Sequence, residues 1–164
     1  MRKAIVWPLL LAGCIAAKPD KPTVSFRDTS VAISSSTRFD PQRFAGDWTR
    51  LADFGSPYTD AGCGTLRFTP LPDNKMALRS CGEGAGAAMQ YAIAPFGRLE
   101  AEGTDPIWVL WIAEDFGTAV LGTPSGAFGW IVNRGPRIQP DRYNAAADLL
   151  EFNGYDSSRL KRRQ

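Results

Sequence analysis

The chain after Trp48 is a succession of short apolar runs separated by turn residues, and it contains one segment with a helical pattern. Short runs with this punctuation predict antiparallel β-strands. The helix is predicted at about residues 140–152, because Pro140 lies in its first turn and Gly154 follows its end. Many consecutive strands followed by one helix predict an all-β domain, either a closed up-and-down barrel or a sandwich. The clearest strand runs are 48–54, 64–68, 76–80, 89–94, 98–101, 107–113, 118–122 and 128–133.

The run 107–113, IWVLWIA, is apolar on both of its faces. A strand of this kind needs cover outside the sheet as well as inside it. Tyr143, Ala147 and Leu150 form one apolar stripe of the predicted helix. We therefore expect that helix to pack against the outer face of the sheet.

The N-terminus has the pattern of a lipoprotein signal peptide. Three residues, Met-Arg-Lys, precede an apolar run, residues 4–11, that is too short to span a bilayer as a permanent helix. The run ends in Leu-Ala-Gly-Cys, which resembles the bacterial lipobox and predicts removal of residues 1–13 and acylation of Cys14. Several acyl chains would attach the protein firmly to a membrane, since each buried methylene contributes about 0.8 kcal/mol. The alternatives are an ordinary signal peptide that happens to contain a cysteine, or a buried helix.

The segment that follows, residues 14–38, is rich in Pro, Ser, Ala and Lys and predicts a tether, so that the folded domain spans residues 39–164. Loss of the signal peptide reduces the 19 basic residues to 17, which equals the number of acidic residues. A near-neutral chain gives no electrostatic reason to expect a nucleic-acid partner. The basic run 159–163 is interpreted as a solvated tail, with contact to anionic lipid as the alternative.

Cys63 and Cys81 are expected to form a disulfide in an oxidising compartment. A hairpin that folds about Pro72 and pairs Phe68 with Met76 places the two cysteines directly opposite each other. A redox-active pair is the competing interpretation, but the chain has no Cys-x-x-Cys motif. The disulfide is therefore interpreted as structural.

The stretch 39–48, FDPQRFAGDW, leads into the first strand. Asp40 and Pro41 predict the start of a short helical turn, and Gly46 suits a bend before Trp48. The Gly-x-Trp ending resembles the first sequence motif of lipocalins.

Three further segments extend this resemblance. The run 130–136, WIVNRGP, resembles the last lipocalin motif, in which a strand ends in an arginine just before the helix. Residues 113–116, AEDF, occupy the place of the middle motif but depart from its usual Thr-Asp-Tyr, and residues 154–156 also match. With the lipobox, these motifs resemble the bacterial lipocalins, outer-membrane lipoproteins related to apolipoprotein D, over nearly all of residues 39–160.

The resemblance implies an eight-stranded antiparallel up-and-down barrel with the C-terminal α-helix packed outside it. It also implies a lipid-anchored location at the outer membrane, facing the periplasm, and leaves open a homodimer. In this family the motif Trp and Arg meet at the closed end of the barrel. Here they are Trp48 and Arg134, preceded by Gly46, and their role is structural.

Ligand binding in such a barrel comes from its interior. Arg50 and Ala52 alternate with Trp48 and are expected to share its inward face. Arg50 would suit a fatty-acid carboxylate or a lysophospholipid phosphate, and the alternative is that it lies near the rim and meets solvent or an acidic neighbour. The predicted apolar wall consists of Leu66, Phe68, Met76, Leu78, Trp108, Leu110, Phe128 and Trp130. Each of these also fits plain core packing, and the phase of 108/110 against 109/111 is not settled.

The sequence gives little support for catalysis. It has no histidine, which removes Ser-His and Cys-His pairs and the commonest transition-metal and haem ligand. The Gly-rich segment 82–86 lacks the Gly-Lys-Ser/Thr ending of a phosphate loop. We therefore expect no enzyme, cofactor or metal site, but a binding protein for a small lipophilic ligand, used in storage or transport in the cell envelope. The alternatives are a structural or interaction lipoprotein whose barrel is filled by its own side chains and, with less support, an enzyme for lipophilic substrates.

Overall fold

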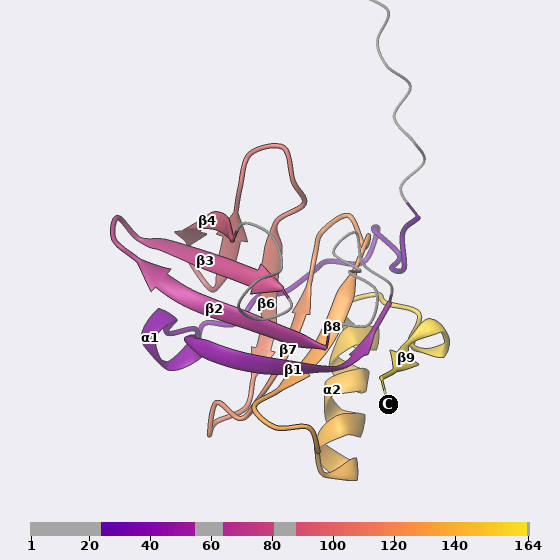
Figure 1. The fold of residues 1–164 in the computed structure, drawn as a ribbon. Helices are drawn as coiled ribbons and strands as arrows, with labels where there is room; N and C mark the ends of the chain where they lie inside the picture. Colours follow the sequence, from indigo (N-terminus) through magenta and orange to yellow (C-terminus); the bar gives the residue numbers. More distant parts are fainter. Residues whose placement is uncertain (1–23, 55–63, 81–87, 164) are drawn as a thin grey trace, which may run out of the picture.

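The structure is a computed structural model that describes residues 24–54, 64–80 and 88–163. Within these residues nine strands form one antiparallel sheet, in which each strand from β2 to β8 pairs with the next. Pairing of β1 with both β8 and β2 closes the first eight strands into a barrel, and β9 adds to β1 (Figure 1). The predicted eight-stranded barrel is confirmed. The strands are β1 (Gly46–Asp53), β2 (Thr65–Leu71), β3 (Lys75–Ser80), β4 (Met89–Ala94), β5 (Arg98–Glu100), β6 (Ile107–Ile112), β7 (Thr118–Gly122), β8 (Gly129–Asn133) and β9 (Lys161–Arg162).

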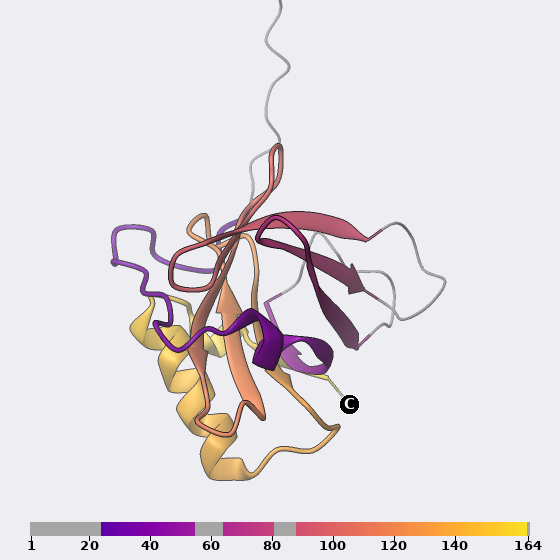
Figure 2. The same cartoon turned by 90° about the vertical axis from the view of Figure 1, so that its left-hand side faces the viewer.

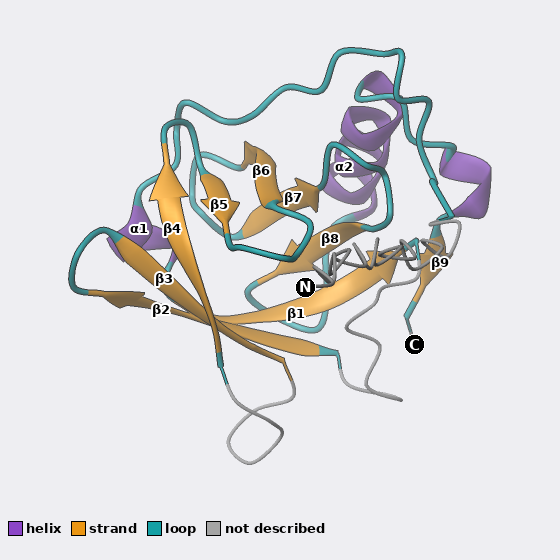
Figure 3. Cartoon of the chain, turned by 90° about the horizontal axis from the view of Figure 1, so that it is seen from above, coloured by secondary structure: helices purple, strands orange, loops and turns teal. Residues whose placement is uncertain are grey.

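Helix α2 (Pro140–Phe152) lies along the outside of the barrel and contacts β6, β7 and β8 (Figures 2 and 3). Its buried residues are Tyr143, Ala146 and Leu150. They form an outer cluster with apolar residues that face outward from the strands, among them Val120 and Ile131. The helix thus supplies the outside cover that the doubly apolar strands require. Among the described residues, neither this helix nor any other has the length and apolar content needed to cross a membrane.

Helix α1 (Pro41–Phe44) is a single turn that plugs one end of the barrel. The Asp40 carboxylate accepts hydrogen bonds from the backbone N–H groups of Gln42 (2.9 Å) and Arg43 (3.1 Å), as a helix cap does. Phe44 is fully buried and joins the inner cluster. The predicted helical turn before the first strand is present.

The predicted hairpin of β2 and β3 forms, but with a different register. The structure pairs Phe68 with Leu78, whereas the predicted register pairs Phe68 with Met76. The predicted register is therefore wrong by two residues. The shorter turn that results is compatible with the sequence, because Asp73 and Asn74 adopt φ values of 59° and 55°, a left-handed conformation that Asp and Asn tolerate.

Two strands contain bulges. The register of β1 against β8 shifts between Arg50 and Ala52, and that of β6 against β7 shifts between Val109 and Trp111. A bulge adds one residue to one strand of a pair. Beyond it, the alternation of inward and outward side chains changes phase.

Of the predicted tether, residues 14–38, the structure describes residues 24–38, and these pack against the barrel rather than extending away from it. The described part begins at residue 24 and runs across the molecule to α1 (Figure 1). The buried guanidinium of Arg27 donates to the carbonyl oxygens of Asn153 (3.0 Å) and Pro124 (2.8 Å). The Ser36 N–H donates to the carbonyl of Val109 at 2.7 Å. The boundary predicted at residue 39 therefore lies inside the packed domain.

Candidate functional site

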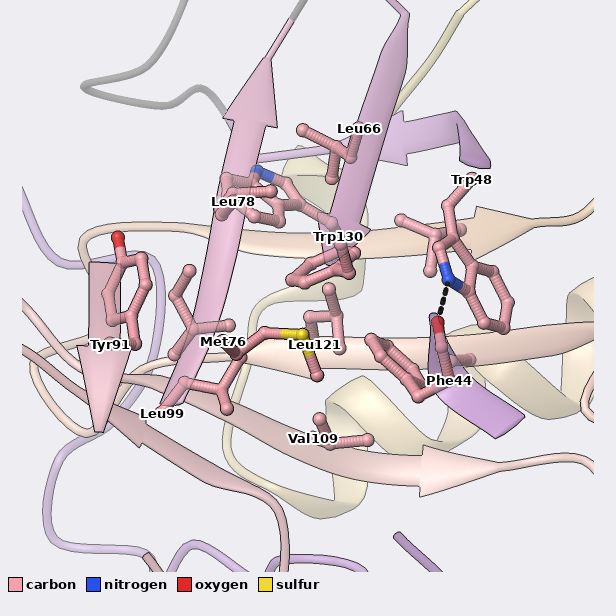
Figure 4. Packing of buried hydrophobic residues seen from close by; sticks show 14 of the residues in the cluster. Phe44, Trp48, Leu66, Met76, Leu78, Tyr91, Leu99, Val109, Leu121 and Trp130 are labelled. Carbon is pink, nitrogen blue, oxygen red and sulfur yellow. Dashed lines mark hydrogen bonds between the residues drawn. The ribbon is translucent and has the colours of Figure 1, made fainter. Parts of the chain in front are cut away.

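The interior of the barrel is lined by apolar side chains from all eight closing strands (Figure 4). Six of the predicted wall residues belong to this inner cluster: Leu66, Phe68, Met76, Leu78, Phe128 and Trp130. The same cluster also contains residues that were not predicted for the wall, among them Tyr91, Leu99, Ile107, Val109 and Leu121. Their signal in the sequence is period-two alternation within the strand runs, which identifies a face but not which face is the inner one.

Ala52 was predicted to face inward, and Trp108 and Leu110 were named for the inner wall with their phase left open. The structure places all three in the outer cluster. Ala52 lies beyond the bulge of β1, where the inward phase has changed. In β6 it is Val109 whose side chain points into the barrel. Trp108 packs outside, where the guanidinium carbon of Arg98 lies 4.1 Å from its ring centre. These three corrections have one cause, since strand phase is set by pairing and bulges rather than by hydrophobicity alone.

Arg50 is fully buried within the barrel wall. Its Nε lies 3.7 Å from the Asp53 carboxylate, and its guanidinium carbon lies 5.6 Å from the Trp130 ring centre. Asp53 also pairs with Arg163, just beyond β9. Arg50 thus meets an acidic neighbour, which was part of the alternative to a ligand contact, while its predicted role in ligand binding stays a prediction. The three side chains together carry one net positive charge next to an apolar wall.

Trp48 and Arg134 meet at the end of the barrel that α1 plugs. The guanidinium carbon of Arg134 lies 3.9 Å from the Trp48 ring centre, and burial lowers the pKa of this arginine. Its Nη atoms donate to the carbonyl oxygens of Arg43 (2.8 Å) and Asp47 (3.1 Å). The Trp48 indole N–H donates to the Phe44 carbonyl at 2.9 Å. The predicted contact between the two motif residues is present, and it joins β1, β8 and α1.

The AEDF segment lies at the same end. Phe116 is buried in the inner cluster, and the Arg43 guanidinium carbon lies 3.8 Å from its ring centre. Asp115 accepts hydrogen bonds from the Gly117 N–H and from Arg142, both at 2.8 Å, which lower the pKa of its carboxyl. Despite its departure from the usual motif, this turn therefore ties α2 to the closed end.

Tyr155, three residues after the end of α2, anchors the chain beyond the C-terminal end of the helix. Its hydroxyl accepts a hydrogen bond from the Thr123 N–H at 2.8 Å and lies 2.8 Å from the Phe128 carbonyl, to which it donates. Burial raises the pKa of Tyr155 to about 12. The Tyr155 side chain fits only because Gly122 and Gly129 have no side chains: a Cβ at Gly122 would lie 2.6 Å from its hydroxyl oxygen, and one at Gly129 would lie 2.9 Å from its ring.

The remaining predicted site residues cannot be placed. Cys14, Cys63 and Cys81 lie outside the described residues, so lipidation and the disulfide stay predictions. Among the residues that the structure does describe, no group of three or more potential metal ligands comes together.

Comparisons with known proteins agree with this geometry. A family model described as a lipocalin-like domain matches residues 76–164, more than half of the chain. Temperature-induced lipocalin-1 of Arabidopsis thaliana is 33% identical over 57 residues, which are 35% of this chain and only 31% of that protein.

Solved structures show the same fold at low sequence identity. Insecticyanin from the tobacco hornworm Manduca sexta superposes with a TM-score of 0.56 and 14% identity, over 81% of this chain and 84% of its own. Lobster apocrustacyanin A1 gives a TM-score of 0.54 and 16% identity, over 74% of this chain and 77% of its own. With the barrel, the outer helix and the Trp48–Arg134 contact in place, the chain belongs to the lipocalin-like family.

Proposed function

We propose that this protein is a membrane-anchored lipocalin that binds a small anionic amphiphile, such as a fatty acid or a lysophospholipid, inside its barrel. It would store or transport that ligand in the cell envelope. Lipocalins are generally binding proteins rather than enzymes, and the fold implies a small hydrophobic ligand. The ligand class and the anchor are our inference.

One observation carries the choice of an anionic amphiphile: a buried guanidinium stands next to an otherwise apolar inner wall. An acyl chain in contact with Leu66, Phe68 and Met76 gains about 0.8 kcal/mol for each methylene removed from water. A carboxylate or phosphate head group gains a charge-assisted hydrogen bond from Arg50. Hydrophobic burial would then supply affinity, and Arg50 would favour anionic over neutral head groups.

Mass spectrometry of what co-purifies with the full chain, expressed with export to the periplasm, tests this proposal. We expect a stoichiometric acyl lipid that is released when the protein is denatured. A barrel that emerges empty, and that also fails to bind added lysophospholipid and fatty acid, would contradict it.

A second candidate function is supported by the size of the inner side chains. Trp48, Trp130, Phe68 and Phe128 are at most 1% exposed, and the rings of Phe128 and Trp130 stack 4.7 Å apart. Side chains of this size suit a barrel filled by its own residues, and hence a structural or interaction lipoprotein. The empty outcome of the same experiment would favour this function.

The proposed location rests on Cys14 and the lipobox around it. Labelled palmitate should be incorporated into the wild-type chain and not into a Cys14→Ser variant. That variant should leave the outer-membrane fraction, because acyl chains supply the attachment. Equal membrane association of the two chains would contradict a lipid anchor.

A further inference from the structure

The outer surface of the barrel carries a pocket that is separate from the interior. It has a volume of about 350 Å³ and lies between β1, the chain from β9 to Arg163, and the loop that leads into α2. Three arginines and several apolar side chains line it, among them Arg137, Arg162, Arg163, Leu51, Ile138 and Tyr143. Among the described residues, none that lines the pocket is acidic.

The positive charges of the pocket are held in place by contacts within the fold. The guanidinium carbon of Arg162 lies 3.7 Å from the ring centre of Tyr143. The Arg163 N–H donates to the Leu51 carbonyl at 2.8 Å, and its side chain pairs with Asp53. Arg163 is therefore largely committed to a carboxylate, whereas Arg162 rests on an aromatic ring.

Arg137 stands at the other side of the pocket. Its carbonyl accepts a hydrogen bond from the Asn133 side-chain amide at 2.8 Å, which fixes the loop, while its own side chain is exposed. Arg137 and Ile138 also line a neighbouring pocket of about 520 Å³, together with Arg134 and Arg142. The two pockets are thus neighbours that share Arg137 and Ile138.

The chemistry of the lining specifies the kind of ligand. Guanidinium groups bind phosphate oxygens in bidentate geometry and lose little hydration in doing so. Leu51 and Ile138, next to these cations, provide a surface for hydrocarbon. A ligand that combines a phosphate with adjacent hydrocarbon would contact both the arginines and the apolar side chains of the pocket. A free inorganic anion would contact the arginines alone.

We propose that this outer pocket binds the phosphate-bearing head group of an anionic amphiphile, with Arg137 and Arg162 contacting the phosphate oxygens and Leu51 and Ile138 contacting the adjoining hydrocarbon. The site is distinct from the barrel interior and from Arg50. The amphiphile can be a monomer in solution or a lipid in a bilayer surface. The head-group chemistry is the same in both cases.

The test compares a double variant, Arg137→Gln with Arg162→Gln, with a matched control, Arg159→Gln with Lys161→Gln. Both remove two positive charges from the same part of the surface, but the control residues do not line the pocket. The probes are monomeric dihexanoyl phosphatidylglycerol, the zwitterionic dihexanoyl phosphatidylcholine, and inorganic phosphate. Binding to the full chain is followed by calorimetry and by the side-chain NMR signals of the arginines.

We expect the anionic lipid to bind and the double variant to lose roughly 30-fold in affinity, since each basic residue near an anionic lipid contributes about 1 kcal/mol. The control should change less than about 3-fold. An equal loss in the control would overturn the proposal, because the attraction would then be diffuse. Equal affinity for inorganic phosphate would also overturn it, because the apolar side chains of the pocket would then have no role.

A second arm identifies the source of the ligand. Phosphatidylcholine vesicles are prepared with and without phosphatidylglycerol, and all variants have the same N-terminus, so that any difference between them reports on the pocket. Weaker binding of the double variant to the anionic vesicles points to a bilayer lipid. Binding of the short-chain lipid alone points to a monomer.

Two controls separate this site from others and from misfolding. Arg137→Gln alone changes an exposed side chain, so its thermal stability should match that of the wild type, and it should still lose about 5-fold in affinity. Barrel ligands are read by tryptophan fluorescence, and no tryptophan in the described part of the chain lines the pocket. A negative result for the outer pocket therefore does not bear on the proposed ligand binding inside the barrel.

Discussion

The guanidinium carbon of Arg134 lies 3.9 Å from the ring centre of Trp48, and the same side chain donates to the carbonyl oxygens of Asp47 and Arg43. Residues 86 positions apart in the chain are thereby joined at the point where β1 meets β8. Gly46 is part of the same unit, because its φ of 101° suits glycine and a Cβ there would lie 3.1 Å from Nη1 of Arg134. The contact thus fastens the first strand, the last barrel strand and α1 together.

Replacing Arg134 with Gln should lower the free energy of unfolding by about 1–3 kcal/mol, because it removes a cation–π contact and two charge-assisted hydrogen bonds. Urea denaturation measures this loss. Arg137→Gln is the matched control: it removes the same charge three residues later, from an exposed side chain that takes no part in these contacts, and should change stability by less than about 0.5 kcal/mol. Equal effects of the two substitutions would contradict a specific role for the contact.

The raised pKa of the Tyr155 hydroxyl predicts that the protein loses stability in alkaline solution. Burial raises the pKa of its hydroxyl from 10.0 to about 12 in the folded state. Above pH 10 the unfolded chain therefore loses this proton while the folded chain keeps it, so the free energy of unfolding falls as the pH rises. The stability that depends on a protonated Tyr155 is fully present below about pH 10 and is lost by about pH 12. The free energy of unfolding falls by about 3 kcal/mol in total over this range.

Denaturation at several pH values between neutrality and pH 11 measures that slope, and Tyr155→Phe isolates it. The variant should lose about 1–3 kcal/mol at neutral pH, because the Thr123 N–H and the Phe128 carbonyl lose a buried partner. Its stability should then fall less steeply with pH than that of the wild type. Parallel pH profiles would show that another group causes the alkaline loss.

The barrel, the helix and the Trp48–Arg134 contact could be predicted because each has a local or motif signal. The hairpin register could not, since a shift of two residues leaves every side chain on the same face. This is why Phe68 and Met76 face inward in both registers. A bulge has the opposite effect: it adds one residue and moves Ala52 to the outer face without any change of hydrophobicity.

The docked segment before α1 was misread for a different reason. Many of its contacts are made by backbone groups, by serine hydroxyls and by Arg27, whose guanidinium reaches backbone carbonyls, while Phe26 and Ile33 add isolated apolar contacts with the outer cluster. Such contacts need no apolar periodicity, so composition alone indicated a tether. The positively charged pocket was missed because its members come from β1, the loop before α2, α2 itself and the chain end.

The disulfide between Cys63 and Cys81 stays a prediction whose geometric argument relied on the hairpin register that proved wrong. In protein exported to an oxidising compartment and kept unreduced, neither cysteine should react with an alkylating agent, as mass spectrometry of peptides shows. Substituting both with Ala should lower the free energy of unfolding by about 3 kcal/mol, because the bridge closes a loop of moderate length. Alkylation of both residues in the folded, unreduced chain would contradict the bridge.

Arg50 gives the sharpest test of the barrel as an anionic-amphiphile site. Arg50→Met keeps the apolar volume and removes the charge, while Asp53 keeps its pairing with Arg163 and is not left as an isolated buried carboxylate. A fatty acid and its methyl ester differ only in the head group, so they report on the cation separately from acyl-chain burial. The variant should bind the acid at least about 10-fold more weakly and the ester nearly as well as the wild type, because one charged hydrogen bond contributes about 1.5–3 kcal/mol.

Tryptophan fluorescence titration measures both ligands, with Trp130 as a nearby reporter at 5.6 Å from the Arg50 guanidinium carbon. Arg50→Lys keeps the charge and should restore part of the preference for the acid, which a purely structural role of Arg50 would not produce. If the Met variant binds both ligands as the wild type does, Arg50 contributes nothing to head-group binding. Its charge would then serve only to hold Asp53, and the barrel's selectivity would have to come from the shape of its apolar wall.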